Sequence, residues 1–340
     1  MFYPKYNLSQ KLLTNITQIE RLYGQLEVLR IPRKLELNLE RNNLIQSSYI
    51  SNSIEGNPLS LPEVTNLLLG DRIPVNREEK EVKNYFEILK NLDLYGSKVL
   101  SLSTIQQTHQ QLLSGVNDKI AGGIRNKKVI IGHYRKDGEK LALDIKHEPP
   151  FHTKIQIEKV TTELLDWLVA DKHFPIILKI GIFHHQFVYI HPFEDGNGRI
   201  CRLMTAFLLI QSGYLINKYF VLDDWYDIDR SLYSDKLHSA DSGDKTEWLE
   251  YFSDGVKYSL QSALAKVKNA METINIEERP TAREQEVLKL FQATREMTST
   301  DLARKLHISR QQAHNLLTSL VGKGFLGKKG HTKSTYYFVR

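Results

Sequence analysis

The chain has 340 residues, which exceeds one typical domain and suggests two or three. Hydrophobic residues make up 41% and charged residues 25%, as in ordinary soluble globular proteins. A single cysteine, Cys201, excludes a disulfide framework within one chain, and we expect a reducing, cytoplasmic location. The first residues lack the pattern of a signal peptide, and the apolar stretches are too short to span a bilayer, so we expect no membrane association.

The formal net charge of +6 is distributed unevenly along the chain. Residues 281–340 hold eleven Lys or Arg and four Asp or Glu, which gives this stretch a charge of +7 and leaves −1 for the rest. A basic tail on a near-neutral body indicates an appended module that meets phosphate groups or an acidic partner. A solvated basic surface explains the charge equally well.

Apolar residues at helical spacing predict a mostly α-helical protein, and no repeats are visible. Before residue 275 we expect helices over residues 8–31, 33–54, 78–95, 102–114, 154–170, 175–190, from about 199 onward, 227–241, and one or two helices over 245–271. The segment 175–190 is apolar nearly all round, which is typical of a buried central helix.

A β-hairpin interrupts these helices. The runs KKVIIGHY and KLALDIKHEPP flank the polar turn formed by residues 136–139. The pattern of residues changes again near residue 275. The remaining residues predict three short helices and then two strand-like runs around a Gly/Lys turn, with the helices at 283–293, 299–306 and 310–322. We therefore expect an N-terminal helical region (1–100), a central domain (101–275) and a C-terminal module (276–340).

The stretch HPFEDGNGRICR, residues 191–202, follows the buried helix and combines groups that suit phosphate chemistry. Gly196 and Gly198 allow tight backbone geometry just before a helix start, where free N–H groups and the helix dipole favour an anion. Arg199 and Arg202 stand three residues apart at that start, so both guanidinium groups can reach the same anion.

Two further side chains of this loop complete the set. Asp195 can hold a divalent cation against phosphate oxygens, and His191 can act as a general base near neutral pH. Together these groups suit phosphoryl-type transfer, in which positioning and charge neutralisation provide most of the catalysis. Taken singly, a GxG turn, a histidine beside a core helix and arginines at a helix start are more often structural.

The whole string resembles the signature of the Fic domain family, HPFx(D/E)GNGRxxR. All fixed positions are filled, by His191, Pro192, Phe193, Asp195, Gly196, Asn197, Gly198, Arg199 and Arg202. The resemblance covers roughly residues 40–250. It implies a Fic-type helical core with a β-hairpin flap, preceded by an N-terminal helical region that carries an inhibitory helix.

The resemblance also implies an activity, the transfer of AMP from ATP to a Tyr, Thr or Ser hydroxyl of a protein, with pyrophosphate leaving. His191 would take the proton from the target hydroxyl. Asp195 would bind Mg²⁺, which bridges the α- and β-phosphates, whereas Phe193 would be a core anchor. The partners would be ATP and a target protein, and self-modification is expected.

Five further residues of the loop would hold the nucleotide according to the same resemblance. Asn197, together with the N–H groups of Gly196 and Gly198, would hold the α- and β-phosphates. Arg199 would contact the β/γ end of the nucleotide, and Arg202 would contact the γ-phosphate.

The hairpin at 125–150 is similar to the flap of the family. Val129, Ile130, Ile131 and Gly132 fall where an exposed strand edge would pair with an extended target segment by β-augmentation. An ordinary structural hairpin is the alternative interpretation.

The downstream run YSDKLHSADSGD resembles the family pattern YYxxLxxANxGD. Tyr233 and Asp241 would then line the adenine end of the nucleotide site. The chain has Ser234 and Asp241 where the pattern has Tyr and Asn, which puts this assignment in doubt.

The run SNSIEGN, residues 51–57, resembles the inhibitory motif of the family, (S/T)xxxE(G/N), with Ser51, Glu55 and Gly56 in place. The carboxylate of Glu55 can pair with Arg202 in a bidentate way and so withdraw it from the γ-phosphate. The resemblance therefore implies low activity at rest. By itself the motif is short, and a helix that ends at a glycine with a solvated glutamate is the alternative.

The tail resembles a winged helix-turn-helix. Ser309 would cap a recognition-type helix whose outer face carries Arg310, Gln311, Gln312, His314 and Asn315, and the wing would carry Lys328, Lys329, His331 and Lys333. Polar groups at the helix start and lysines for phosphates suit DNA binding through residues 281–340. A winged helix used for protein contact is the alternative.

Several alternatives stay open at the level of sequence. The chain is predicted to be a self-inhibited protein adenylyltransferase. It is alternatively a transcription regulator whose Fic part senses a nucleotide, or an enzyme that removes AMP with Glu55 positioning water. A complete string from His191 to Arg202 favours an enzyme, because a sensor need not retain the base. The sequence does not decide between ATP and another nucleotide or a phosphocholine donor, nor between a monomer and a homodimer.

Overall fold

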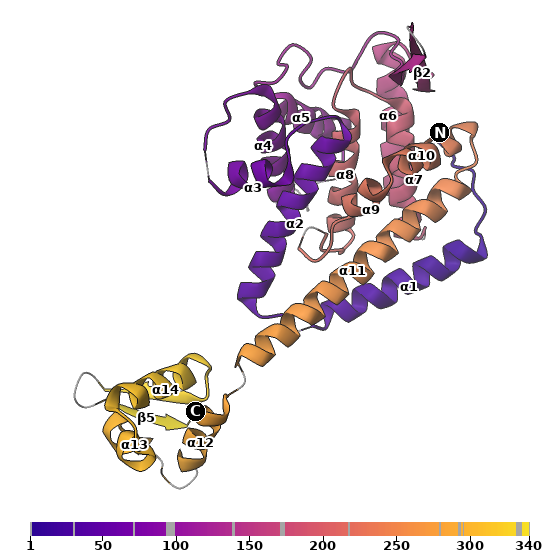
Figure 1. Ribbon diagram of the computed structural model, residues 1–340. Helices are drawn as coiled ribbons and strands as arrows, with labels where there is room; N and C mark the ends of the chain where they lie inside the picture. The colour runs from indigo at the N-terminus through magenta and orange to yellow at the C-terminus, as the bar shows by residue number, and fades with distance from the viewer. Residues whose placement is uncertain are drawn as a thin grey trace. The chain divides into compact units, whose positions relative to one another are not determined.

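The computed structural model describes residues 2–29, 31–70, 72–92, 99–137, 140–170, 174–216, 218–278, 280–291, 294, 296–330 and 335–339. The chain divides into two compact units, residues 1–266 and residues 267–340. Helix α11 (Thr246–Glu278) runs from the first unit into the second, and the predicted boundary near residue 275 lies in its last turn (Figure 1).

The first unit is mostly helical and carries a small antiparallel hairpin, which confirms the predicted fold class. Its helices besides α11 are α1 (Gln10–Glu27), α2 (Arg33–Ile54), α3 (Leu61–Leu69), α4 (Arg77–Lys90), α5 (Leu102–Leu113), α6 (Lys154–Ala170), α7 (Ile176–Ile190), α8 (Asn197–Gln211), α9 (Asp223–Ile228), α10 (Arg230–Ser239) and the 3₁₀ turn η2 (Ala240–Ser242). The hairpin strands are β1 (Ile131–Asp137) and β2 (Lys140–His147).

Helix α7 is buried nearly all round, as its apolar sequence predicts, and packs against α8. Helix α11 also reaches α7 closely, because Trp248 Nε1 donates a hydrogen bond to the carbonyl of Gly181 at 2.7 Å. A Cβ atom at Gly181 would lie 2.9 Å from side-chain atoms of Leu249 and Phe252. The glycine therefore sets the distance between these two helices, and the loop between α7 and α8 starts from a rigid core.

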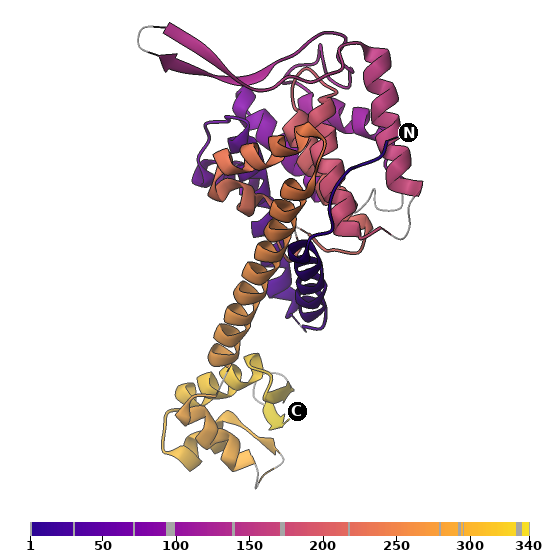
Figure 2. The ribbon, with the colours of Figure 1, turned by 90° about the vertical axis from the view of Figure 1, so that its right-hand side faces the viewer.

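Helix α1 lies alongside α11 in both ribbon views (Figures 1 and 2). Asn15 Nδ2 on α1 donates to Ser253 Oγ at 3.0 Å and to Asp254 Oδ1 at 2.9 Å. The residues before α1 are also fixed, since the backbone N–H of Lys245 donates to the carbonyl of Lys5 at 2.9 Å. The N-terminal segment is thereby tied to the start of α11.

Helix α2 packs through a polar face. Ser47, Ser48, Ser51 and Asn52 are all buried, and the helix contacts α4, α8 and α9. It ends at Ile54, with Glu55 as its C-cap and Gly56 at φ 87°, a conformation that favours glycine. The helix thus ends where predicted, and the predicted inhibitory motif runs from the buried Ser51 to the exposed Glu55 and Gly56.

One helix of this region is absent from the sequence prediction. Helix α3 begins after Ser60, whose side chain and backbone bond Glu63 in a capping box. A Ser followed three residues later by Glu is a recognisable start signal before an apolar run. The sequence prediction included the end of the preceding helix but did not use the Ser60 and Glu63 spacing as the start of a new one.

The hairpin projects away from the helices in Figure 2. Its strands pair antiparallel, from Asp137 opposite Lys140 to Ile131 opposite His147, with a register shift between Ile131 and Gly132. The strand begins later than predicted, so Val129 and Ile130 precede it. The upstream backbone has another partner, because the carbonyl of Lys127 accepts a hydrogen bond from Arg125. The tip of the predicted turn lies outside the described residues.

The second unit consists of three helices and a three-stranded antiparallel sheet in the order β3-β5-β4. The elements are α12 (Ala282–Phe291), β3 (Glu296–Met297), α13 (Ser299–Leu306), α14 (Arg310–Gly322), β4 (Leu326–Lys329) and β5 (Tyr336–Val339). The predicted helices agree within two residues, and Ser309 caps α14, as predicted. Buried apolar side chains from α12 to β5 form a separate core, which fits a winged helix. The predicted wing residues His331 and Lys333 lie outside the described residues.

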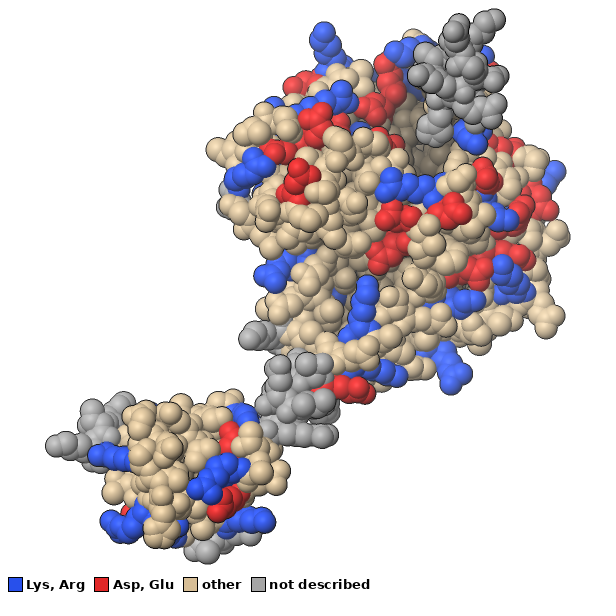
Figure 3. Space-filling model, in the orientation of Figure 1, with Lys and Arg blue, Asp and Glu red and all other residues tan. Residues whose placement is uncertain are grey.

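Acidic and basic side chains interleave over the visible face of the first unit in Figure 3, in keeping with its near-neutral charge. Among the described residues, none of the helices combines the length and apolar character that crossing a membrane requires.

Gly181→Ala should lower the free energy of unfolding of the first unit by about 1–3 kcal/mol, because the added methyl group overpacks the contact with Leu249 and Phe252. Urea unfolding followed by circular dichroism measures the change. Gly24→Ala in α1 is the matched control, since an added Cβ there has no atom within 4 Å and should be neutral or slightly stabilising. Equal urea midpoints for the two variants would contradict the packing argument.

Candidate active site

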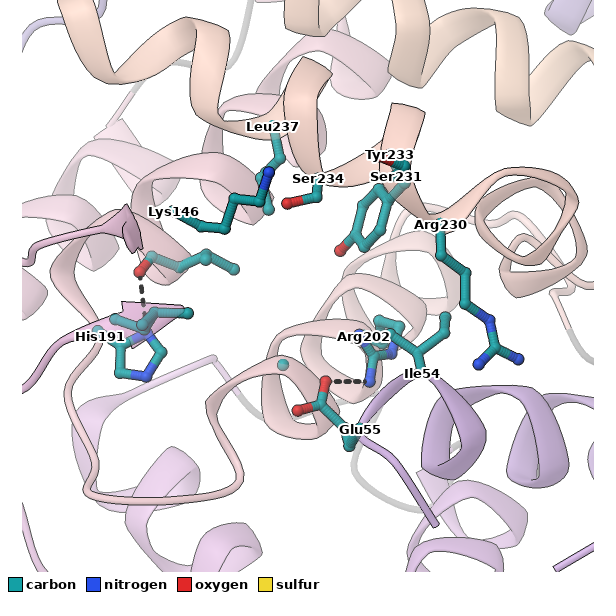
Figure 4. A pocket seen from close by; sticks show the side chains of 13 residues that line it. Ile54, Glu55, Lys146, His191, Arg202, Arg230, Ser231, Tyr233, Ser234 and Leu237 are labelled. Carbon is teal, nitrogen blue, oxygen red and sulfur yellow. Dashed lines mark hydrogen bonds and ion pairs between the residues drawn. The ribbon is translucent and has the colours of Figure 1, made fainter. Parts of the chain in front are cut away.

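A cavity of about 450 Å³ opens where the end of α2, the loop after α7, the base of the hairpin and α10 meet (Figure 4). It is lined by Ile54, Glu55, Ile131, Lys146, Val188, His191, Gly198, Arg202, Arg230, Ser231, Tyr233, Ser234 and Leu237. The structure thus brings the predicted base, one predicted arginine and the inhibitory glutamate to one cavity, although they lie up to about 150 residues apart in sequence.

His191 caps the C-terminus of α7 in the left-handed conformation, at φ 52° and ψ 64°. Its ring Nδ1 faces the carbonyl of Val188 at 3.3 Å. A carbonyl can only accept, so Nδ1 carries the hydrogen and Nε2 keeps its lone pair. Burial lowers the pKa of His191 to about 3, so the ring is neutral at physiological pH. A neutral imidazole with an unprotonated nitrogen is the state that a general base requires.

Arg125 fixes the backbone around His191. Its Nε donates to the carbonyl of His191 at 2.6 Å, and its Nη2 donates to the carbonyl of Ile190 at 3.1 Å. Its backbone N–H donates to the carbonyl of Pro192 at 3.0 Å. Arg125 is buried, so one residue holds three consecutive carbonyls that begin with the last residue of α7. This satisfies acceptors that a helix end would otherwise leave open.

His109 on α5 supports the other half of the loop. Its ring stacks on Phe193 with centroids 3.7 Å apart and planes 5° apart. The N–H of Gly122 donates to its Nδ1 at 2.9 Å, so its Nε2 carries the hydrogen and donates to the carbonyl of Asp195 at 3.0 Å. Burial lowers the pKa of His109 to about 4, which keeps this neutral tautomer. The contact also agrees with the prediction that Phe193 is a core anchor.

The side chain of Asn197 closes the loop on itself. Its Oδ1 accepts from the N–H of Phe193 and its Nδ2 donates to the carbonyl of the same residue, both at 2.9 Å. Gly196 stands at φ 78° just before α8, and its N–H donates to Asp195 Oδ1 at 2.6 Å. Both groups are therefore used within the loop, and the backbone N–H groups of Asn197, Gly198 and Arg199 in the first turn of α8 are without an intrahelical acceptor.

Arg202 is held by Ser51 and Glu55 of the predicted inhibitory motif. Its Nη2 lies 2.7 Å from Glu55 Oε1 and 2.8 Å from the carbonyl of Ser51, and its Nε lies 2.8 Å from Ser51 Oγ. The expected bidentate pair with Glu55 is replaced by a bond to one carboxylate oxygen, because Ser51 occupies Nε. Burial alone would lower the pKa of Arg202, but the Glu55 carboxylate raises it, so the guanidinium stays charged.

Gly198 makes room for this ion pair. A Cβ atom built at Gly198 would overlap Glu55 Oε1 well inside van der Waals contact and would lie 3.2 Å from Arg202 Nη1. The absence of a side chain at this position thus lets the carboxylate reach the arginine. Figure 4 shows Glu55 pointing at Arg202, with His191 across the cavity.

Arg199 is a buried cation with unused donors. Its Nη2 lies 3.4 Å from Asp195 Oδ1 and its Nη1 lies 3.5 Å from Glu81 Oε2. Within the described part of the chain, its Nε and Nη1 have no hydrogen-bond partner. Buried polar groups are normally bonded, so these donors fit an anion that approaches from the start of α8. Asp195 beside it keeps its side chain 39% exposed.

The structure brings Tyr233 to the cavity but not Asp241. The Tyr233 hydroxyl bonds His184 Nε2 at 2.9 Å, and its ring lines the cavity wall. Asp241 is absent from the lining residues, and its carboxylate instead bonds the imidazoles of His147 and His185 at 2.7 and 2.9 Å. Those bonds outweigh the effect of burial and hold the pKa of Asp241 well below its usual range.

Of the predicted flap residues, Ile131 lines the cavity. Ile130 is exposed just before the strand, Val129 precedes it, and Gly132 lies opposite Ile145 in the ladder. Of these four residues, the structure therefore brings Ile131 to the cavity and does not place Val129, Ile130 or Gly132 in its lining.

Sequence reasoning missed three supporting residues, namely Arg125, His109 and Arg230. Arg230 lines the cavity and donates to the carbonyl and Oγ of Ser53 at 2.9 Å. These bonds connect α10 to the last turn of α2. The partners of the three residues are mostly backbone atoms far away in sequence, which no local pattern reveals. The one local signal in the sequence was the position of Arg125 shortly after Gly122-Gly123.

Residues 99–209 match the model of the Fic/DOC family, and residues 282–330 match that of the IclR helix-turn-helix domain. The chain therefore contains a Fic/DOC domain, as its loop suggested, and Fic protein adenylyltransferases are its homologues.

Two curated relatives show how low the sequence identity is. The chain is 25% identical over 271 residues to "Protein adenylyltransferase Fic" of Nematostella vectensis, covering 76% of this chain and 57% of the relative. It is 27% identical over 235 residues to "Protein adenylyltransferase fic-1" of Caenorhabditis elegans, covering 66% and 42%. The chain spans about half the length of the curated relatives it matches.

Solved structures share the fold. A Fic family protein from Desulfovibrio desulfuricans G20 superposes with a TM-score of 0.67 at 24% identity, covering 100% of this chain and 98% of that one. Fic-1 from C. elegans superposes with a TM-score of 0.61 at 23% identity, covering 76% and 73%.

Gly198→Ala should destabilise the wild-type chain more than it destabilises a chain with Glu55→Gly, because the added methyl group collides with the Glu55 carboxylate. We expect a coupling of about 0.5–3 kcal/mol between the two positions. Thermal or urea unfolding of the wild type, both single variants and the double variant measures it. Additive effects would show that Glu55 does not occupy the space beside Gly198.

Proposed function

We propose that this chain transfers AMP from ATP to a Tyr, Thr or Ser hydroxyl of a protein and that it also modifies itself. The observation that carries the proposal is the neutral His191 with its unprotonated Nε2, set in the same cavity as the buried cation Arg202. The relatives named protein adenylyltransferase support the same reaction.

The proposed reaction forms one bond and breaks one. The oxygen of the target hydroxyl attacks the α-phosphorus of ATP while its proton passes to His191 Nε2. The bond between the α-phosphorus and the bridging oxygen breaks, and pyrophosphate leaves with the electron pair. The Nδ1–H bond to Val188 and the Arg125 bond to the His191 carbonyl orient the ring, so little reorganisation is needed at the moment of transfer.

The start of α8 is the proposed phosphate cradle. The N–H groups of Gly198 and Arg199 lack intrahelical acceptors, and the guanidinium of Arg199 has unused donors. Asp195 fits a Mg²⁺ ion, since a partly exposed carboxylate plus substrate phosphates is a usual Mg²⁺ environment. Bound there, the ion would neutralise phosphate charge.

Self-inhibition follows from the occupancy of Arg202. While Glu55 and Ser51 hold the guanidinium, it is not available to the γ-phosphate that the family resemblance assigns to it. A carboxylate beside that position also repels the phosphate. ATP phosphates would then settle out of line for attack, and resting activity would be low.

His191→Ala should abolish AMP transfer, with a loss of at least about a hundredfold, while ATP binding and the fold are largely retained. The reason is that His191 offers the one open ring nitrogen beside the proposed reaction path. Transfer of α-labelled ATP to protein, followed on a gel, measures the loss. Self-modification near the wild-type rate would overturn the assignment of the base.

Glu55→Gly should raise self-modification strongly, because it frees Arg202 for the γ-phosphate. Adding Arg202→Ala should cancel the gain. Labelled ATP with the label at the α- or γ-phosphate distinguishes AMP transfer from phosphate transfer, and only the α-label should remain on protein. Equal labelling of Glu55→Gly and wild type across several Mg²⁺ concentrations would refute self-inhibition.

A second function, DNA binding by the C-terminal unit, is favoured by the surface of α14. Arg310, Gln311, His314 and Asn315 are exposed on its outer side, while Leu317 and Leu320 are buried. Lys328 and Lys329 are exposed on β4. Polar readers on a helix together with nearby lysines suit a DNA duplex, and the match to a helix-turn-helix model supports it.

A chain that ends near residue 275 should retain the self-modification produced by Glu55→Gly, because all proposed site residues precede that point. The full chain should shift duplex DNA in a gel, with affinity falling steeply as salt rises, because several cations displace counterions. The truncated chain is the control and should not shift it. No shift of the full chain at micromolar protein in low salt would leave protein contact as the better role for the tail.

A further inference from the structure

We propose that His147, His238 and Asp241 form a binding site for a divalent transition-metal ion, zinc by preference, at the base of the hairpin. Their ligand atoms all lie within 4.8 Å of one another. The three residues come from different elements, since His147 ends β2, His238 lies near the end of α10, and Asp241 lies in η2. Such convergence of distant side chains gives a preformed site rather than a local turn.

Two imidazoles point the same nitrogen at one carboxylate oxygen. His147 Nδ1 lies 2.7 Å from Asp241 Oδ2, and His238 Nδ1 lies 3.1 Å from it. Their rings are nearly parallel, at 20°, with centroids 5.1 Å apart. Small side-chain movements would open the spacing between nitrogen and oxygen to that of ligands around one ion.

The positions of the ring hydrogens then require a cation between His147 and Asp241. His147 Nε2 lies 3.0 Å from the carbonyl of Tyr189, which can only accept, so Nε2 carries a hydrogen. In the neutral ring Nδ1 is therefore bare and faces the Asp241 carboxylate, lone pair toward lone pair. Either a second proton or a metal ion must lie between them.

The surrounding bonds match those of a metal site. Lys245 Nζ donates to His185 Nδ1 at 2.8 Å, so His185 Nε2 carries the hydrogen that Asp241 Oδ1 accepts at 2.9 Å. One carboxylate oxygen is thus held in place while Oδ2 faces the two imidazoles. Ligating histidines that donate to a backbone carbonyl and ligating carboxylates that accept an outer hydrogen bond are the usual second layer around a bound metal.

The residue at position 241 supports a charged ligand. Asp241 stands at the point where three histidines converge, His147, His185 and His238. An asparagine would supply neither the charge nor the second acceptor oxygen. Two imidazoles and one carboxylate suit zinc, and partial exposure of Asp241 leaves space for water as a fourth ligand.

Bound metal would join two walls of the cavity. Lys146, next to His147, and Leu237, next to His238, both line it, so the ion would tie the base of the hairpin to α10. The site is separate from Asp195, and it does not depend on the proposed AMP transfer.

The test uses the full chain, freed of metal with a chelator that is then removed, and titrated with Co²⁺ at pH 7.5. Tetrahedral cobalt gives strong visible absorption bands, and we expect one equivalent to bind and then to be displaced by Zn²⁺. Calorimetry with Zn²⁺ gives the stoichiometry independently. Absence of binding to the wild type by both methods would show that the cation beside His147 is a proton and would overturn the proposal.

Variants locate the site. Asp241→Asn and His238→Gln should each weaken metal binding at least about tenfold. His152→Gln, at an exposed histidine, and Asp195→Asn should leave the cobalt spectrum unchanged. Circular dichroism and thermal unfolding check that each variant is folded. Wild-type affinity in folded Asp241→Asn, or loss of the spectrum in Asp195→Asn, would place the metal elsewhere and contradict the proposal.

Discussion

The structure depends most on the buried charge of Arg202. Its side chain is 2% exposed, and an arginine does not lose its proton in proteins, so an anion must accompany it at all times. In this chain Glu55 supplies that anion, with 32% of its own side chain still exposed. A phosphate group of a nucleotide is the natural competitor. In the proposed function, inhibition by Glu55 and binding of a nucleotide phosphate would be two ways to satisfy this one electrostatic requirement of Arg202.

That requirement explains features that hydrophobic packing does not. Helix α2 buries Ser47 and Ser51 rather than apolar residues on the side facing α8. Ser51 binds Arg202, and Ser47 bonds the carboxylate of Asp223, whose pKa burial raises to about 6. Polar contacts therefore hold the side of α2 that faces α8 and α9. Its other side packs through Ile45 against Val64, Leu67 and Val82 in an apolar cluster.

The sequence was sufficient where periodicity or a local motif sets the structure, and insufficient where distant backbone atoms do. The apolar run of α7 predicts a buried helix, and Ser309 predicts the start of α14 because it is a good N-cap residue. The backbone at the end of α7, by contrast, is held by Arg125, whose bonds reach carbonyls 65 and 66 residues away. His109 likewise acts on a carbonyl 86 residues away. Neither the residue type nor the spacing in the sequence predicts such contacts, because any backbone carbonyl can be the acceptor.

The number of ring nitrogens that have a hydrogen-bond partner distinguishes His191 from the other histidines around the loop. The sequence alone does not give this number. Around the loop, the rings of His109, His147, His184 and His185 each have both nitrogens engaged by partners. In the described chain His191 has one nitrogen engaged and lines the cavity with the other open. A ring with both nitrogens occupied cannot accept a substrate proton without breaking a bond. Among these five histidines of the described chain, the open nitrogen of His191 in the cavity is what supports the assignment of that residue as the base.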